Sequence, residues 1–230
     1  MKPALPRRAV AEFTATAFLL MAVVGSSIMA ERLADGNAAL ALLANAIATG
    51  AALMALIFTF GEVSGAHMNP VVTLAEAAGG FFPWRDAPAY VAAQIAGAFA
   101  GVAAAHRMFG LPLFTPSLQV RSGPAQILSE CIATFGLLMV ISGCARSRPH
   151  MAAFAVSAYI VAAYWFTAST SFANPAVTLA RSMTNTFSGI RVSDAVGFIA
   201  AQFAGAAAGV LFTRWQAKPN PAAAGGPAGG

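Results

Sequence analysis

The chain has 230 residues, of which 58% are hydrophobic and only 9% are charged, and its mean hydropathy is +0.70. A soluble domain carries about a quarter charged residues, so this composition excludes an ordinary soluble protein and indicates a membrane protein. The net charge of +5 comes from basic residues scattered among the connections, which argues against a nucleic-acid partner.

Six apolar segments follow one another along the chain, and each is long enough to cross about 30 Å of hydrocarbon as a helix. They are residues 9–30, 37–60, 87–105, 122–144, a span within 151–180, and 195–213. Basic residues are more frequent on the side of the termini, which predicts a multi-pass protein of the cell inner (plasma) membrane with both termini cytoplasmic. The first span also has features of a signal peptide, but Glu12 at its start favours a retained helix.

Long stretches of the sequence occur twice. The segment NPVVTLAEAAGG from Asn69 matches NPAVTLARSMTN from Asn174, and AQIAGAFAGVAAA matches AQFAGAAAGVLF. The surroundings of Glu12, AEFTAT, resemble those of Glu130, SECIATF. We therefore interpret the chain as two copies of one structural unit.

The two copies divide the chain into a first repeat, 1–115, a second repeat, 116–217, and a tail, 218–230, whose composition predicts disorder. Each repeat has three spans, so the second enters the bilayer from the opposite side and the repeats are inverted. Matched Gly-xxx-Gly spacings predict close backbone packing of the third span against the sixth. These glycines are Gly97, Gly101, Gly205 and Gly209.

Each repeat has an Asn-Pro pair between a loop-like segment and a helix-forming one. Pro70 and Pro175 suit the first position of a helix, and Asn69 and Asn174 suit the cap before it, with the amide NH₂ left free to donate. The helices that follow run about ten residues, roughly 15 Å or half the hydrocarbon thickness. Two half-helices from opposite faces would meet at the bilayer centre, where their positive ends repel cations and orient water. The pattern predicts a pore for small neutral solutes that excludes ions and protons.

A secondary transporter coupled to an ion gradient is the alternative, because inverted repeats and broken helices are also features of transporters. Glu12 and Glu130 would then be candidates for a proton relay. We expect no enzyme activity and no cofactor. Cys131 and Cys144 suggest core packing more than a disulfide or a metal site, and His67 has no second metal ligand spaced with it.

Taken together, these motifs resemble the major intrinsic protein family, the aquaporins and aquaglyceroporins. The resemblance rests on SGAHMNPVVTLA, on FANPA, on the paired glutamates and on the AQ repeats. It implies an all-α membrane protein with six transmembrane helices plus two re-entrant half-helices, an inverted repeat, one pore per subunit and a homotetramer. The implied pore motifs are Asn69, Pro70 and Val71 in the first repeat and Asn174, Pro175 and Ala176 in the second. The residues expected to support the loops are Glu12, Glu130 and His67.

The resemblance also implies a second constriction, or selectivity filter, of four residues counted from the asparagines: Thr49, Ala162, Ser171 and Val177. Water-selective and glycerol-conducting members have an arginine where this chain has Val177. We therefore expect a wider opening, lined by two hydroxyls and without a fixed positive charge. Similarity to bacterial members found beside arsenic-resistance genes makes trivalent arsenic, as arsenous acid, a candidate solute beside glycerol-like polyols and water.

Arg181 has two open interpretations. It lies four residues beyond Val177 on the same helix face, so its guanidinium could overhang the outer vestibule near the missing arginine. Alternatively, Arg181 and its counterpart Glu76 are solvated or contact lipid headgroups. The aromatic residues at the end of the fifth span either narrow the pore or serve as packing and interface anchors: Tyr164, Trp165 and Phe166.

Overall fold

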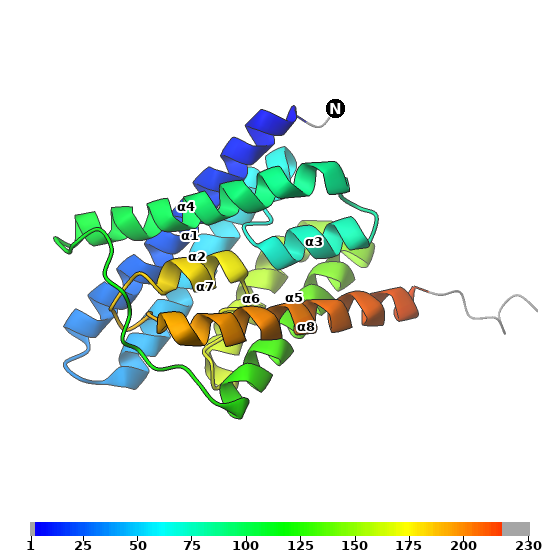
Figure 1. Ribbon diagram of the computed structural model, residues 1–230. Coiled ribbons are helices and arrows are strands. Elements are labelled where there is room, and N and C mark those ends of the chain that lie inside the picture. The colour runs from blue at the N-terminus through cyan, green and yellow to red at the C-terminus, as the bar shows by residue number, and fades with distance from the viewer. Residues whose placement is uncertain (1–2, 218–230) are drawn as a thin grey trace, which may run out of the picture.

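The computed structural model describes residues 3–217 (Figure 1), and the predicted tail 218–230 lies outside the described residues. All regular structure within them is helical, and six helices are long and apolar enough to cross a membrane, as predicted. The long helices are α1 (Leu5–Leu33), α2 (Ala38–Ser64), α4 (Ala87–Met108), α5 (Pro124–Ser147), α6 (Ala152–Phe166) and α8 (Val192–Gln216). Single 3₁₀ turns, Trp84–Asp86 and Pro149–Met151, precede α4 and α6.

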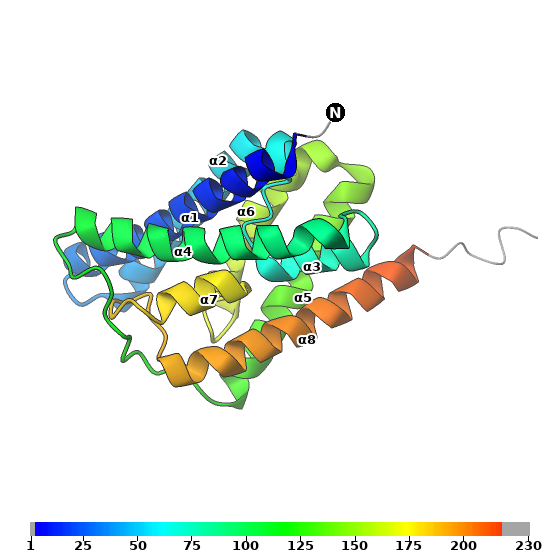
Figure 2. The same cartoon turned by 45° about the horizontal axis from the view of Figure 1, so that its top comes forward.

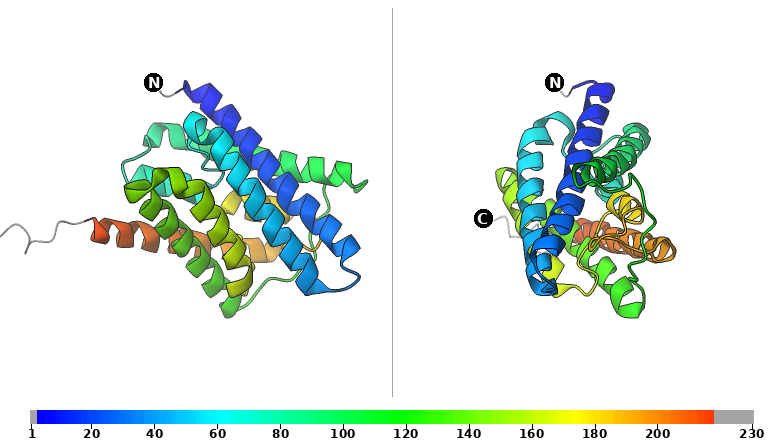
Figure 3. Two further views of the ribbon diagram at one scale, coloured as in Figure 1. Left: turned by 180° about the vertical axis from the view of Figure 1, so that it is seen from behind. Right: turned by 90° about the vertical axis from the view of Figure 1, so that its left-hand side faces the viewer.

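Two short helices, α3 (Pro70–Ala78) and α7 (Pro175–Arg181), lie between α4 and α8 (Figure 2). We call 64–78 the first re-entrant segment and 169–181 the second. Helix α1 packs against α2 and α4, while α5 packs against α6 and α8 in the same manner. Contacts between α2 and α6 join the two sets. The tilted helices α1, α2, α5 and α6 form the side of the bundle that faces the viewer in the left view of Figure 3.

Glycine positions determine how closely the long helices approach. A Cβ on Gly97 of α4 would lie 2.3 Å from the carbonyl oxygen of Phe13 in α1, and one on Gly205 of α8 would lie 2.2 Å from that of Cys131 in α5. The prediction that these glycines join the third span to the sixth is therefore wrong. They bring α4 onto α1 and α8 onto α5, because a helix without side chains on one face lets the partner backbone approach.

The second short helix ends sooner than the sequence suggested. It has 7 residues, against 9 in α3. The Ile190 N–H donates to the Arg181 carbonyl at 3.2 Å, and the Ser117 N–H donates to the Ser182 carbonyl at 2.9 Å. The connection 109–123 and the chain after α7 thus take the carbonyl groups that a longer helix would use.

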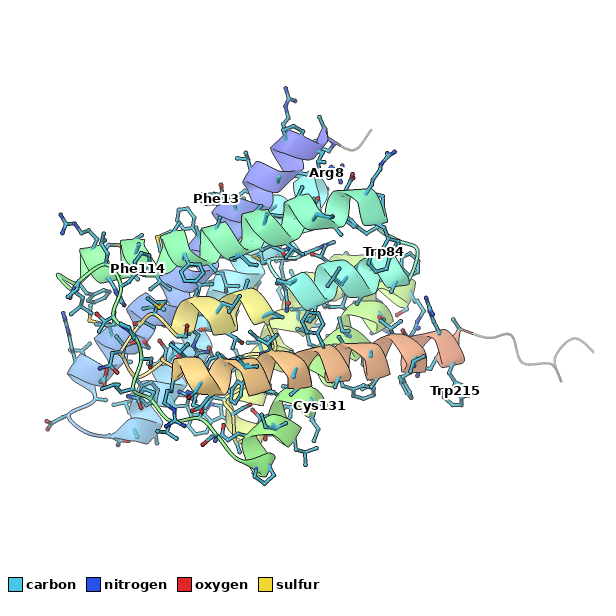
Figure 4. The ribbon with its side chains drawn as sticks, in the orientation of Figure 1. Arg8, Phe13, Trp84, Phe114, Cys131 and Trp215 are labelled. Carbon is cyan, nitrogen blue, oxygen red and sulfur yellow. The ribbon has the colours of Figure 1, made fainter. Side chains whose placement is uncertain are left out.

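Aromatic side chains mark the two ends of the bundle. Trp84 and Trp215 are exposed at the end where Arg8 lies, and Phe114 is exposed at the opposite end (Figure 4). Tryptophan is enriched where a membrane meets water, so the end that carries Trp84 and Trp215 corresponds to one interface. Cys131, which Figure 4 places on α5, is a free thiol.

Candidate functional site

A cavity of about 390 Å³ runs beside the two short helices. It begins near Arg8 and Glu62 and reaches Thr49 and Val177, and we call the Val177 end its outer end. Much of the lining is aliphatic and comes from α1, α2, α5 and α6: Leu19, Val23, Leu53, Ile57, Leu137, Ile141, Val156 and Ile160. Most of the polar lining comes from the two re-entrant segments, with Thr49 and Tyr164 added from α2 and α6, so the cavity has an apolar side and a polar side.

The backbone of both re-entrant segments is held in an unusual conformation. Ala66 and Met68 have φ of 48° and 49°, and Ser171 and Ala173 have φ of 52° and 47°. Each pair lies three residues and one residue before the asparagine of its segment. Non-glycine residues in this left-handed region cost of order 1–3 kcal/mol each and persist only where the surroundings hold them.

Glu12 supplies much of that hold in the first segment. Its fully buried carboxylate accepts hydrogen bonds from the Ser64 hydroxyl at 2.6 Å and from the backbone N–H groups of His67 at 2.9 Å and Met68 at 2.7 Å. The Gln94 amide on α4 donates to the same carboxylate at 2.8 Å. A charged acceptor thus ties a strained loop to two long helices.

Glu130 takes the equivalent place in the second segment. It accepts from the N–H groups of Phe172 and Ala173, both at 2.9 Å, and from the Gln202 amide at 2.7 Å. Neither Glu130 nor Glu12 lines the cavity. Their geometry suits loop supports, whereas a proton relay would need contact with the solute path.

His67 also lies in the first segment, at the edge of the cavity. Its Nδ1 is 3.0 Å from the Thr73 hydroxyl, and its ring packs edge-on against Phe82 with centroids 5.2 Å apart. A second ring, Tyr90, lies 5.4 Å away. The histidine therefore joins the loop to α3 and to the segment before α4.

The two asparagines cap their own helices and bridge to each other's segment. The Asn69 side-chain oxygen accepts from the Val71 N–H at 3.1 Å, as its predicted cap position requires. Its Nδ2 donates to the Ala173 carbonyl at 2.8 Å, and Asn174 Nδ2 donates to the Met68 carbonyl at 2.8 Å. The expectation that the whole NH₂ group stays free is thus corrected. One hydrogen of each amide is engaged, and one remains for the cavity.

At the outer end, three of the four residues counted from the asparagines line the cavity: Thr49, Ser171 and Val177. The fourth, Ala162, does not. Its side chain is exposed, and α6 instead presents Tyr164, whose hydroxyl lies 3.2 Å from the Thr49 hydroxyl. The predicted place of Ala162 in the constriction is therefore replaced by Tyr164.

The rotation of α6 explains this correction. The helix is apolar on every side, so its sequence contains no amphipathic signal that tells which face points inward. Packing against α2 decides it: a Cβ on Gly50 would lie 2.3 Å from Val161 Cγ2 and 3.3 Å from the Ser157 carbonyl oxygen. With that face on α2, positions four apart, such as Ile160 and Tyr164, face the cavity.

Arg181 is a further residue at the outer end. It is only 2% exposed and lines the cavity, so the interpretation as a solvated or headgroup-bound side chain is wrong for Arg181. Its guanidinium carbon lies 3.4 Å from the centroid of the Phe172 ring, and its Nε donates to the Ser188 carbonyl. Its counterpart Glu76 is half-buried and also lines the cavity.

Comparisons with known proteins agree with this architecture. Residues 1–152 match the family model described as major intrinsic protein. The aquaglyceroporin AqpS of Rhizobium meliloti (strain 1021) is 54% identical over 215 residues, which cover 94% of this chain and 92% of that protein. The aquaporin NIP1-4 of Oryza sativa subsp. japonica is 38% identical over 208 residues, covering 86% of this chain and 72% of the relative.

The same fold occurs in a solved structure, the aquaglyceroporin from Plasmodium falciparum. That chain is 21% identical and superposes with a TM-score of 0.71, covering 92% of this chain and 95% of its own. Six spanning helices, two short helices that bridge through their asparagines, and these relatives lead to one conclusion. The chain belongs to the major intrinsic protein family and is a passive membrane channel for small neutral solutes, not an enzyme.

Proposed function

We propose that the channel conducts glycerol-like polyols and arsenous acid, with water alongside them. The observation that carries this proposal is the outer end of the cavity, where Thr49 and Tyr164, whose hydroxyl groups lie 3.2 Å apart, line the cavity together with Val177. A solute with several hydroxyl groups can pair with these side chains in place of water.

The remaining lining suits the same solutes. The aliphatic side of the cavity accommodates a carbon backbone without hydrogen bonds, while the asparagine side offers donors. Small-molecule sites in proteins are typically apolar, with a few placed polar groups. Arsenous acid is neutral, compact and rich in hydroxyls, so it meets the same groups as glycerol does.

Ions and protons are excluded at the centre of the pore. Asn69 and Asn174 each keep one amide hydrogen for the cavity, beside the amino ends of α3 and α7. Amino-terminal helix ends carry partial positive charge, which disfavours cations. Donors on both sides orient a water molecule with its oxygen toward the asparagines, which breaks a relay of protons.

In this proposal the channel is a homotetramer in the cell inner membrane, with both termini in the cytoplasm. The excess of basic residues on the side of the termini supports the orientation. Large exposed apolar side chains on the spans support burial in lipid and in subunit contacts.

Stopped-flow light scattering of proteoliposomes tests the proposal with water, glycerol and arsenous acid in parallel. We expect all three to cross faster than in protein-free liposomes, and collapse of ion gradients to leave the rates unchanged. Flux that stops when the gradients collapse would support the ion-coupled transporter instead.

A pair of matched variants shows whether flux follows this cavity. Val177→Trp should block glycerol because it fills the outer end, whereas Ala162→Trp should leave it unchanged because that side chain points away from the cavity. Glycerol flux that survives in Val177→Trp vesicles, at equal protein content, would contradict the proposed path.

A further inference from the structure

Arg181 carries a charge that no described carboxylate pairs with. The ion pairs among residues 3–217 join Arg8, Arg85 and Arg191 to acidic side chains, and Arg181 is in none of them. A buried cation without an acidic partner is expensive, so a structure retains it where packing and hydrogen bonds offset the loss of water. Its position therefore calls for an explanation from the residues around it.

The surroundings of Arg181 hold the side chain in one place. The guanidinium carbon lies over the Phe172 ring, 3.4 Å from its centroid, and a cation is attracted to an aromatic face. Nε donates to the Ser188 carbonyl, which anchors that side of the guanidinium group. The stack and the single bond fix the orientation of the group.

The other end of the guanidinium is available to the cavity. Its two Nη atoms donate to no described residue, yet neither is among the enclosed polar atoms that lack a partner. They therefore reach accessible space, and Arg181 lines the cavity together with Ser171 and Val177. Their N–H groups face whatever occupies the outer end.

Arg121 provides an informative contrast on the same ring. Its guanidinium lies 5.2 Å from the Phe172 centroid, but it donates to the carbonyls of Gly189, Ser169 and Phe187. It does not line the cavity. Arg121 thus stabilises the loops. Arg181 donates one hydrogen bond to a loop through Nε, and its two Nη groups remain available to the pore.

We propose that Arg181 is the specificity-determining cation of the pore, standing one helical turn beyond the position that Val177 occupies. Its charge opposes cation entry at the outer end, and its Nη groups donate to the hydroxyl oxygens of a passing solute. This inference rests on the proposed function and adds to it a charge that the four-residue constriction lacks.

The charge also acts on the centre of the pore. Arg181 lies seven residues beyond Asn174, about 10 Å along the helix. At an effective dielectric of about 20, a unit charge at that distance changes cation conductance by about tenfold. A neutral side chain at this position should therefore be detectable even though the asparagine barrier remains.

The test measures cation conductance and glycerol flux in the same vesicles. Arg181→Gln, or Arg181→Met if the glutamine variant does not fold, should raise sodium and potassium conductance by about tenfold while glycerol still crosses. Arg181→Lys should stay within about twofold of wild type. The matched control is Arg107→Gln, which removes the same charge from the exposed end of α4.

A second measurement separates the charge from a merely structural role. A buried lysine loses its proton at a lower pH than arginine does. Conductance of the Arg181→Lys channel should therefore rise at alkaline pH, reversibly, while that of wild type stays low. A loop support alone would not give this titration.

The outcomes distinguish two failures. The role of Arg181 is overturned if the neutral variants conduct cations no better than wild type and the conductance of the lysine variant does not change at alkaline pH, while glycerol flux persists. Absence of glycerol flux through the wild-type channel overturns the proposed function itself.

Discussion

The first and second re-entrant segments share one backbone frame, and two of the positions at which their side chains differ determine the chemistry of the cavity. In both, a glutamate accepts N–H groups of the loop, a glutamine donates to that glutamate, and an asparagine caps a short helix. Two residues before the asparagine, however, the first segment has His67 and the second has Phe172. Seven residues after it, the first has Glu76 and the second has Arg181.

This comparison separates what the frame requires from what each end of the pore does. The strained loops are stable only with buried charged acceptors, so Glu12 and Glu130 occur in both halves. The positions of His67 and Phe172 and of Glu76 and Arg181 line the cavity, and the second pair determines its charge. An acid toward one mouth and a base toward the other make the pore electrically asymmetric although the fold is nearly symmetric.

The largest expected effect comes from breaking the frame. Glu12→Gln replaces a charged acceptor by an amide that places a donor against loop N–H groups, and each such bond is worth about 1.5–3 kcal/mol. Glu12 accepts four bonds and Glu130 three, so we expect a lower yield of folded protein for both glutamine variants, with the larger loss for Glu12→Gln. The loss is measured as the yield of folded protein in size-exclusion chromatography and as the midpoint of thermal unfolding in detergent.

Glu62→Gln is the control for this prediction, because Glu62 is exposed on α2. Normal yields for the Glu12 and Glu130 variants, combined with lost coupling to a proton gradient, would revive the transporter alternative.

The next effect sharpens the contrast at the outer end. Val177→Arg adds a long cation beside Thr49, Tyr164 and Ser171, narrowing the opening while water still pairs with its donors. The ratio of glycerol to water permeability should fall about tenfold or more, the scale on which a changed pocket contact discriminates. Arsenous acid should follow glycerol.

The new arginine would also face Arg181 one turn away. Arg181→Ala in the Val177→Arg channel should therefore partly restore the folded yield by removing like-charge repulsion. A permeability ratio that stays constant or rises would show that Val177 does not border the narrow part of the pore.

A smaller effect tests the centre, where the two segments meet. Asn69→Asp or Asn174→Asp puts a carboxylate beside the amino ends of α3 and α7, offsets their positive potential and should admit cations. Planar-bilayer recordings measure the conductance. Asn185→Asp is the control, since Asn185 is exposed and accepts from the Leu118 N–H through an oxygen that aspartate keeps. Folded variants that remain impermeable to ions would place the barrier elsewhere.

The smallest effect concerns the pair of hydroxyl groups on Thr49 and Tyr164 at the outer end of the cavity. Thr49→Val, Tyr164→Phe and their double variant form a cycle for the 3.2 Å contact. We expect a coupling of about 0.5–1.5 kcal/mol in thermal stability. Additive effects of the two substitutions would show that the hydroxyls bind solute or water and not each other.

The sequence alone predicted the spans and the two short helices because the signals for both are local. Twenty apolar residues in a row have few alternatives in a membrane, and Asn-Pro before a helix-forming run positions a cap and a first turn. The glutamates in matched surroundings also indicated supports for the loops. None of these inferences depends on how one helix is rotated against another.

Rotation and long-range contact account for what the sequence missed. Counting residues back from Asn174 gives a position along α6 but does not tell which side of that helix faces the cavity. Ala162 was therefore expected where Tyr164 lies. Similarly, the glycine spacing predicted a close contact but not its partner. Both were decided by interdigitation of side chains from separate helices, which a single helix does not encode.

Two polar features of the pore, the asparagine bridges and the buried Arg181, were also decided by the tertiary structure. The asparagine amides bridge residues more than a hundred positions apart, through Asn69 to Ala173 and Asn174 to Met68. Arg181 was open to two interpretations until its burial against Phe172 showed it inside the cavity. A sequence determines which residues are adjacent along the chain, whereas the charge inside a pore depends on which distant segments close around it.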